Sequence, residues 1–95
     1  MRELQSIRAD INEIDKRMRK LFLERLSLAR EIAEYKKARG LEIYDPQREN
    51  QVIEQNTNEL EDKSLEPYYL NFLKSNMEIS RAYQHTVISE SSSDD

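Results

Sequence analysis

The fold of this chain is decided by residues 3–39, which read ELQSIRADINEIDKRMRKLFLERLSLAREIAEYKKAR. Apolar side chains recur here at alternating spacings of three and four residues, which is typical of a helix that packs against another helix. We expect a helix from about Glu3 to Arg39, ended by Gly40, because glycine favours the left-handed position after a helix. The apolar stripe contains Leu4, Ile7, Ile11, Ile14, Met18, Leu21, Leu28, Ile32 and Tyr35, with Arg25 in the same register.

The length of this predicted helix indicates an oligomer. At about 1.5 Å per residue it extends for about 55 Å, which is longer than a compact domain of 95 residues is wide. Hydrophobic residues make up only 37% of the chain, so one copy has little core of its own. We therefore expect a homodimer.

Arg25 is the most informative residue of the stripe. A guanidinium keeps its charge under all ordinary conditions, and burying it without a partner is costly. Either a carboxylate of the protein or an anionic ligand must therefore meet it.

Composition predicts one small all-α domain over residues 1–88. The chain has one glycine, two prolines and 36% charged residues, and strand signals are nearly absent. Its net charge of −4 comes from 15 basic and 19 acidic residues spread evenly, which argues against nucleic acid as a partner. Without a long apolar run or a signal peptide we expect no membrane partner and a cytoplasmic location. With no cysteine and one histidine, we expect no metal site.

Two further helices are expected after a connector at 41–44. Asp45 followed by Pro46 is a strong start signal for a helix over 46–60. After a polar break at 61–64, Ser64 is expected to cap a third helix that runs to about Val87. The residues 89–95 are serines and acids with nothing to bury, so we expect a disordered tail. The stripe of the third helix contains Tyr69, Leu73, Met77, Ser80, Gln84 and Val87.

Polar residues on these stripes predict a binding site. Arg25 and Lys36 are eleven residues apart, which places them within about 20° on the helix surface and about 16 Å along it. They can therefore meet the two ends of a small ligand, with Ala29 and Ile32 between them. Ser80 and Gln84 lie one turn apart on an apolar stripe, which is more typical of a wet pocket than of a dry core.

Arg8 can join this site only from a second chain. About 25 Å of helix separates it from Arg25, but antiparallel pairing about residue 20 would bring it level with residue 32 of the partner. Simpler interpretations stay open at this point. Arg8 can be a surface residue paired along the helix, Asp45 to Glu49 an ordinary helix start, and Ser80 with Gln84 tolerated polar core residues.

The ordered set of motifs resembles the all-helical chorismate mutases over roughly residues 4–87. The resemblance implies a three-helix protomer in an intertwined homodimer, with Arg8 supplied across subunits, and an isomerase of phenylalanine and tyrosine biosynthesis. The reaction would be the [3,3] rearrangement of chorismate to prephenate, which needs no cofactor. The motifs are Ile7-Arg8, Ile14-Asp15, Leu23-Glu24-Arg25, Ile32-Ala33-Glu34-Tyr35-Lys36, Asp45-Pro46-Gln47-Arg48-Glu49, and Ser80 followed by Gln84.

The resemblance also implies a role for each site residue. Arg8 of the partner and Arg25 would bind the two carboxylates of chorismate. Lys36 and Gln84 would donate hydrogen bonds to the ether oxygen, which gains negative charge in the transition state. The remaining contacts would be Asp45 and Glu49 at the C4 hydroxyl, Ser80 at the ring carboxylate, and Arg48 on the carboxylate side.

Two alternatives remain. An isochorismate-pyruvate lyase has a similar fold, but the acidic pair Asp45 and Glu49 argues against it. A purely structural helical dimer explains the apolar stripe, but it explains neither Arg25 nor the polar pair on the third helix.

Overall fold

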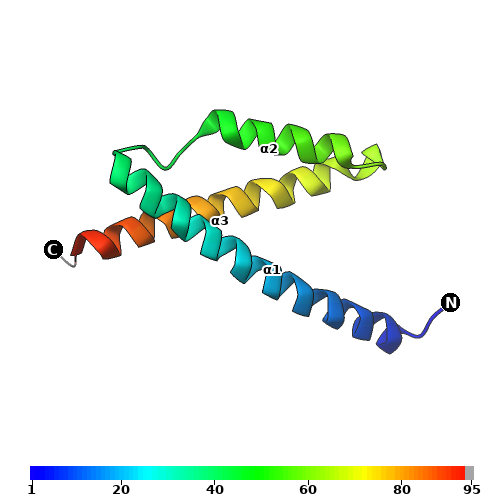
Figure 1. Ribbon diagram of the computed structural model, residues 1–95. Helices are drawn as coiled ribbons and strands as arrows, with labels where there is room; N and C mark the ends of the chain where they lie inside the picture. The colour runs from blue at the N-terminus through cyan, green and yellow to red at the C-terminus, as the bar shows by residue number, and fades with distance from the viewer. Residues whose placement is uncertain (94–95) are drawn as a thin grey trace.

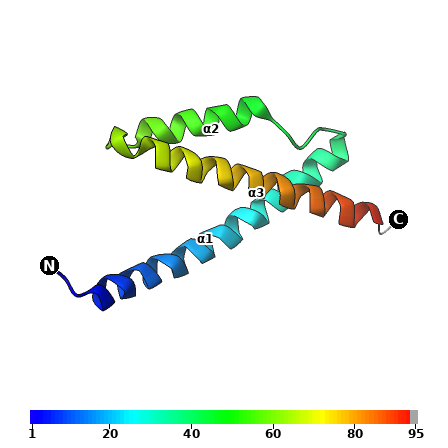
Figure 2. The ribbon, with the colours of Figure 1, turned by 180° about the vertical axis from the view of Figure 1, so that it is seen from behind.

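The computed structural model describes residues 1–93 and contains three α-helices (Figure 1). Helix α1 spans Leu4–Arg39, α2 spans Pro46–Glu59, and α3 spans Glu66–Ser93, with one turn of 3-10 helix, η1, at Lys63–Leu65. No strand occurs within residues 1–93, so the all-α prediction is confirmed. In both views α3 runs back beside α2 and crosses the C-terminal half of α1, whose N-terminal half extends away from the other helices (Figures 1 and 2).

Helix α1 ends at Arg39, followed by Gly40, as the sequence predicts. Gly40 has a φ of 65°, in the left-handed region that glycine enters without strain. Its N–H donates to the carbonyl of Lys37, and the N–H of Leu41 donates to the carbonyl of Lys36 at 2.8 Å. These bonds satisfy the last carbonyls of the helix, so α1 stops there and the chain turns towards α2.

The start of α2 is also confirmed, but the start of α3 differs from the prediction. Asp45 caps α2, its Oδ1 accepting from the backbone N–H of Arg48 at 3.1 Å. The residue expected to cap α3, Ser64, is instead held by Asp62, whose Oδ1 accepts from both the backbone N–H and the hydroxyl of Ser64. A carboxylate is the stronger acceptor of the two, so Asp62 caps η1, which leads directly into α3.

The core lies where α1 crosses α3. On α1 the buried residues are Ala29 and Ala33, with exposed fractions of 3% and 0%, and their small side chains let the two helices approach closely. Thr57 of α2 is also buried, and its hydroxyl donates to the carbonyl of Ile53. The other buried residues are Ile43, Leu73, Met77, Gln84 and Val87.

The end of α3 corrects a prediction. The helix was expected to stop near Val87 and to be followed by a disordered tail at 89–95, yet α3 continues to Ser93. Neither glycine nor proline occurs after Val87, so nothing in the chain interrupts the backbone hydrogen bonds. The last two tail residues, 94–95, lie outside the described part of the chain.

Most of the apolar stripe of α1 is uncovered in the single chain. Ile11, Met18, Leu21 and Leu28 have exposed fractions between 47% and 61%, although they are the residues that a packed interface requires. Along residues 1–93, no helix is both long enough and apolar enough to cross a membrane.

Candidate functional site

A cavity of about 520 Å³ lies between the C-terminal half of α1, the start of α2 and the second half of α3. Its size suits a small organic molecule. Apolar walls come from Ile32, Val52 and Met77, among others. Seven of the eight predicted ligand-binding residues line it, namely Arg25, Lys36, Asp45, Arg48, Glu49, Ser80 and Gln84.

The cavity is positively charged although the chain is acidic. Four cations line it against two carboxylates, an excess of two positive charges in a chain of net charge −4. Such a concentration of one sign inside a concave, partly apolar site attracts anions of the opposite charge. The cations are Arg25, Lys36, Arg48 and Arg81.

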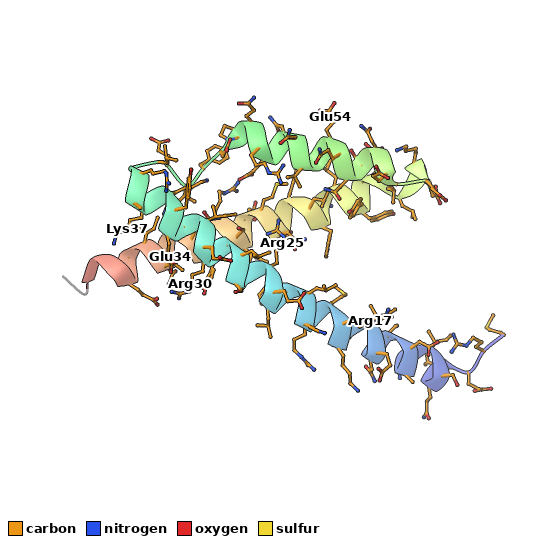
Figure 3. The ribbon with its side chains drawn as sticks, in the orientation of Figure 1. Arg17, Arg25, Arg30, Glu34, Lys37 and Glu54 are labelled. Carbon is orange, nitrogen blue, oxygen red and sulfur yellow. The ribbon has the colours of Figure 1, made fainter. Side chains whose placement is uncertain are left out.

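Arg25 is available to a ligand. Its guanidinium makes no hydrogen bond or ion pair with any residue of the described chain, and Figure 3 shows it on the opposite side of α1 from Arg30. Arg30, by contrast, bonds the hydroxyl of Tyr83 and lies near two carboxylates outside the cavity. Among the four cations that line the cavity, Arg25 is thus the one without a hydrogen-bond or ion-pair partner within residues 1–93.

Lys36 is fixed by the connector between α1 and α2. Its Nζ donates to the carbonyl of Ile43 at 2.7 Å, and the residue is half-buried. An ammonium has three donors, so two remain for a ligand once this bond is made. The connector therefore orients Lys36 without using up its capacity to donate.

Asp45 and Arg48 border the cavity at the first turn of α2. The cap bond from the backbone of Arg48 occupies Oδ1 of Asp45, leaving its second oxygen as an acceptor. The Arg48 side chain donates to Oε1 of Gln51 at 3.0 Å and has no carboxylate partner within residues 1–93. Both side chains are exposed and therefore accessible to a ligand.

Arg81 is a cavity residue that the sequence analysis missed. Its Nη1 contacts both carboxylate oxygens of Glu49, with Oε2 at 2.6 Å, and so ties α3 to α2. Hydrogen bonding to Glu49 raises the pKa of the Arg81 guanidinium, while burial acts in the opposite direction. A signal was present, since Arg81 follows Ser80 and lies three residues before Gln84, which places all three on one side of the helix.

Gln84 is the most deeply buried polar residue of the cavity. Its exposed fraction is 6%, and its Nε2 donates to Oγ of Ser80 at 3.0 Å, one turn earlier on α3. Its Oε1 is buried and has no hydrogen-bond partner in the part of the chain that the structure describes. An amide held at one atom and unpaired at the other is suited to bind a polar ligand atom.

Comparison with known families identifies the chain. The sequence profile of the family described as chorismate mutase type II matches residues 7–85. The chain belongs to this family. The match includes every residue of the candidate site, Arg8 and Gln84 among them.

Two relatives support the assignment to type II chorismate mutases. A chorismate mutase of Methanocaldococcus jannaschii is 44% identical over 52 residues, which is 55% of this chain and 52% of that protein. A bifunctional chorismate mutase/prephenate dehydratase of Aquifex aeolicus is 39% identical over 54 residues, which is 57% of this chain and 15% of that protein. The chain thus spans about half the length of the first relative and a small part of the second. No solved structure gives a significant match.

In this type II chorismate mutase chain, Arg8 is the predicted site residue that does not line the cavity. It lies in the half of α1 that extends away from α2 and α3 (Figure 1). Arg8 is exposed, and it makes no ion pair or hydrogen bond within residues 1–93. The described chain therefore does not contain the pairing along the helix that the simpler interpretation of Arg8 requires.

Proposed function

We propose that this chain is a chorismate mutase, an isomerase that converts chorismate to prephenate as a homodimer. The observation that carries the proposal is the convergence of seven predicted contact residues on one cavity, in which the cation Arg25 has no partner from the described chain. Family membership and the two relatives support the same activity. A cytoplasmic location and a place in phenylalanine and tyrosine synthesis stay predictions.

Substrate binding would depend on the arginines. Chorismate carries two carboxylates, and a guanidinium binds a carboxylate through two parallel, charge-assisted hydrogen bonds. Arg25 offers all its donors to one carboxylate, and Arg8 of the partner subunit would bind the other. Holding both ends restricts the flexible side chain of the substrate to the bent shape in which its reacting carbons meet.

Rate acceleration would depend on Lys36 and Gln84. The rearrangement breaks an ether bond while it forms a carbon–carbon bond, and the ether oxygen becomes more negative on the way. Donors that face the ether oxygen stabilise that charge more than they stabilise the ground state. An acceleration of about 10⁶ requires about 8 kcal/mol, which two such donors at about 3 to 4 kcal/mol each, with conformational restriction, can supply.

The apolar residues of α1 that are exposed in the single chain support the homodimer. Only Ala29 and Ala33 of this 36-residue helix are buried in the single chain. A second copy packed along the exposed stripe would cover it and would bring Arg8 to the opposite cavity. One interface would then provide both stability and a missing ligand-binding residue.

The decisive experiment measures the loss of chorismate absorbance and the appearance of prephenate with purified protein. We expect turnover with kcat/KM of about 10⁴ M⁻¹ s⁻¹ or more. Lys36→Ala should reduce kcat by roughly 10²-fold or more, whereas Lys37→Ala should not, because Lys37 does not line the cavity. Pyruvate release from isochorismate with no prephenate from chorismate would instead identify a lyase, and no turnover of either would indicate a structural dimer.

A further inference from the structure

The ion pair between Glu49 and Arg81 joins two helices inside the cavity. Glu49 belongs to the first turn of α2 and Arg81 to the middle of α3, 32 residues later. Both carboxylate oxygens of Glu49 contact the same Nη1, and the two side chains are 22% and 29% exposed. This makes it the least exposed ion pair in the described chain.

Arg81 is itself oriented by a second contact. Its guanidinium carbon lies 5.1 Å from the centre of the Tyr44 ring, in the connector that precedes α2. A cation over an aromatic face is attracted to the ring, and a planar guanidinium stacks there better than an ammonium. Arg81 is therefore held between a ring and a carboxylate, both from the α2 side of the cavity.

The two acids of the cavity are held by different means. Asp45 is oriented by the backbone, because its Oδ1 caps α2. The carboxylate of Glu49 accepts from no backbone N–H of the described chain and is held instead by the side chain of Arg81. Without Arg81, the flexible glutamate would sample several rotamers, and an unpaired carboxylate would remain half-buried.

Arg81 differs from Arg25 and Arg48 because its charge is neutralised by a carboxylate of the protein. The charge of Arg81 is already compensated by Glu49, whereas Arg25 has no carboxylate partner and Arg48 bonds only a neutral amide within residues 1–93. A compensated pair is a poor receptor for a carboxylate but a good receptor for a hydroxyl, since the fixed carboxylate still has lone pairs that accept an O–H.

We infer that Arg81 is a positioning residue, which holds the carboxylate of Glu49 in place to accept a hydrogen bond from the C4 hydroxyl of chorismate. This inference rests on the proposed function and on the role predicted there for Glu49. Arg25 and Arg8 of the partner subunit bind the carboxylates, while the Glu49–Arg81 pair recognises the hydroxyl on the ring.

The test compares chorismate with 4-deoxychorismate, which lacks the hydroxyl in question. Arg81→Met should lower kcat/KM for chorismate by roughly 10- to 100-fold, the usual cost of a misplaced charged acceptor. The same change should cost less than about 3-fold with 4-deoxychorismate, because there is no hydroxyl to recognise. Arg81→Lys should recover part of the loss, since an ammonium can still contact Glu49.

A double-mutant cycle connects the effect to Glu49. Glu49→Gln should reproduce the loss with chorismate, and adding Arg81→Met to it should cost little more, because both changes remove one interaction. Should Arg81→Met fail to fold, Arg81→Gln takes its place in the cycle. Arg30→Met is the matched control. Arg30 also connects two helices, α1 and α3, but it lies outside the cavity, so this change should leave the preference between the two substrates unchanged.

Each failure has its own signature. Equal losses with both substrates on Arg81→Met would overturn the inference and indicate a direct contact to the dianion or a purely structural role. Independent, additive losses from Arg81→Met and Glu49→Gln would overturn it as well. If Glu49→Gln leaves the preference between chorismate and 4-deoxychorismate unchanged, the role proposed for Glu49 is wrong. If the unmodified protein does not convert chorismate, the proposed function itself is wrong.

Discussion

Nε2 of Gln84 lies 3.0 Å from Oγ of Ser80, while Oε1 of the same amide is buried without a partner in the described chain. A serine hydroxyl both donates and accepts, so it can bond either end of the amide. Turning the amide by 180° would let Ser80 donate to Oε1 and direct Nε2 into the cavity. An ether oxygen only accepts, so the role proposed for Gln84 requires that second orientation when chorismate is bound.

The chemistry of this amide predicts a pH profile. A neutral amide donates at any ordinary pH, so Gln84 should cause no loss of kcat in the unmodified protein up to about pH 8. Gln84→Glu should be active only where the new carboxyl is protonated, so its kcat should fall as pH rises through the pKa of that carboxyl. A profile of the unmodified protein that falls steeply through neutrality, and that Gln84→Ala does not change, would contradict this role.

The variant Arg25→Leu distinguishes the hypothesis of an enzyme from that of a purely structural dimer. Leucine completes the apolar stripe of α1, so the midpoint of urea unfolding should stay the same or rise. Chorismate turnover should fall by roughly 10²-fold or more, since a charge-assisted pair with the substrate is lost. Arg17→Leu provides the control, because Arg17 also belongs to α1 but does not line the cavity. Figure 3 shows Arg17 on the half of α1 that extends away from α2 and α3. Unchanged turnover in Arg25→Leu would remove Arg25 from the site.

Mixed dimers test whether the two subunits share each site. Arg8→Ala and Arg25→Ala should each be nearly inactive alone, because every site lacks one arginine. After unfolding and refolding together in equal amounts, roughly a quarter of the sites should regain both arginines, given random pairing of the chains. Activity of the mixture would be compared with that of the unmodified protein at equal concentration. If mixing restores nothing, Arg8 does not reach the cavity of the partner subunit.

Asp62 predicts a small dependence of stability on acid. The hydroxyl and then the backbone N–H of Ser64 lower the pKa of Asp62 below its ordinary value, so the ionised form is favoured in the folded chain. Its contribution is complete above the pKa of the unfolded chain and is lost as pH falls through the lower, folded-state pKa. Urea midpoints of the unmodified protein and of Asp62→Ala should therefore differ most at pH 6 and approach each other as pH falls below about 3.9, the ordinary pKa of an aspartate. A difference that is the same at every pH would show that Asp62 acts in another way.

Features that depend on neighbouring residues could be predicted from the sequence. Gly40 and Asp45 act within a few residues of themselves, so the end of α1 and the start of α2 follow from local chemistry. Arg25 and Lys36 share the cavity because helical spacing alone places them on one side of α1. Spacing on α3 likewise placed Ser80 beside Gln84.

Features that depend on distant or competing partners could not be predicted. The partner of Arg81 is 32 residues away on another helix, so only the packing of α2 on α3 brings them together. Asp62 and Ser64 are both good capping residues two positions apart, and the choice between them depends on the local backbone of η1. The polar composition of 89–93 predicts a tail, but no residue there breaks a helix, so α3 continues to Ser93.

The uninterrupted course of α1 limits how this sequence can change by insertion and deletion. Each residue added between Arg8 and Arg25 would turn one against the other by about 100° and separate them by about 1.5 Å more. No loop within residues 4–39 can absorb such a change. An extra residue near 60–62 would only lengthen the turn between α2 and η1. Differences in length among related sequences should therefore occur in that turn and not in α1, whose number of residues fixes the spacing between Arg25 and the proposed site residue Arg8.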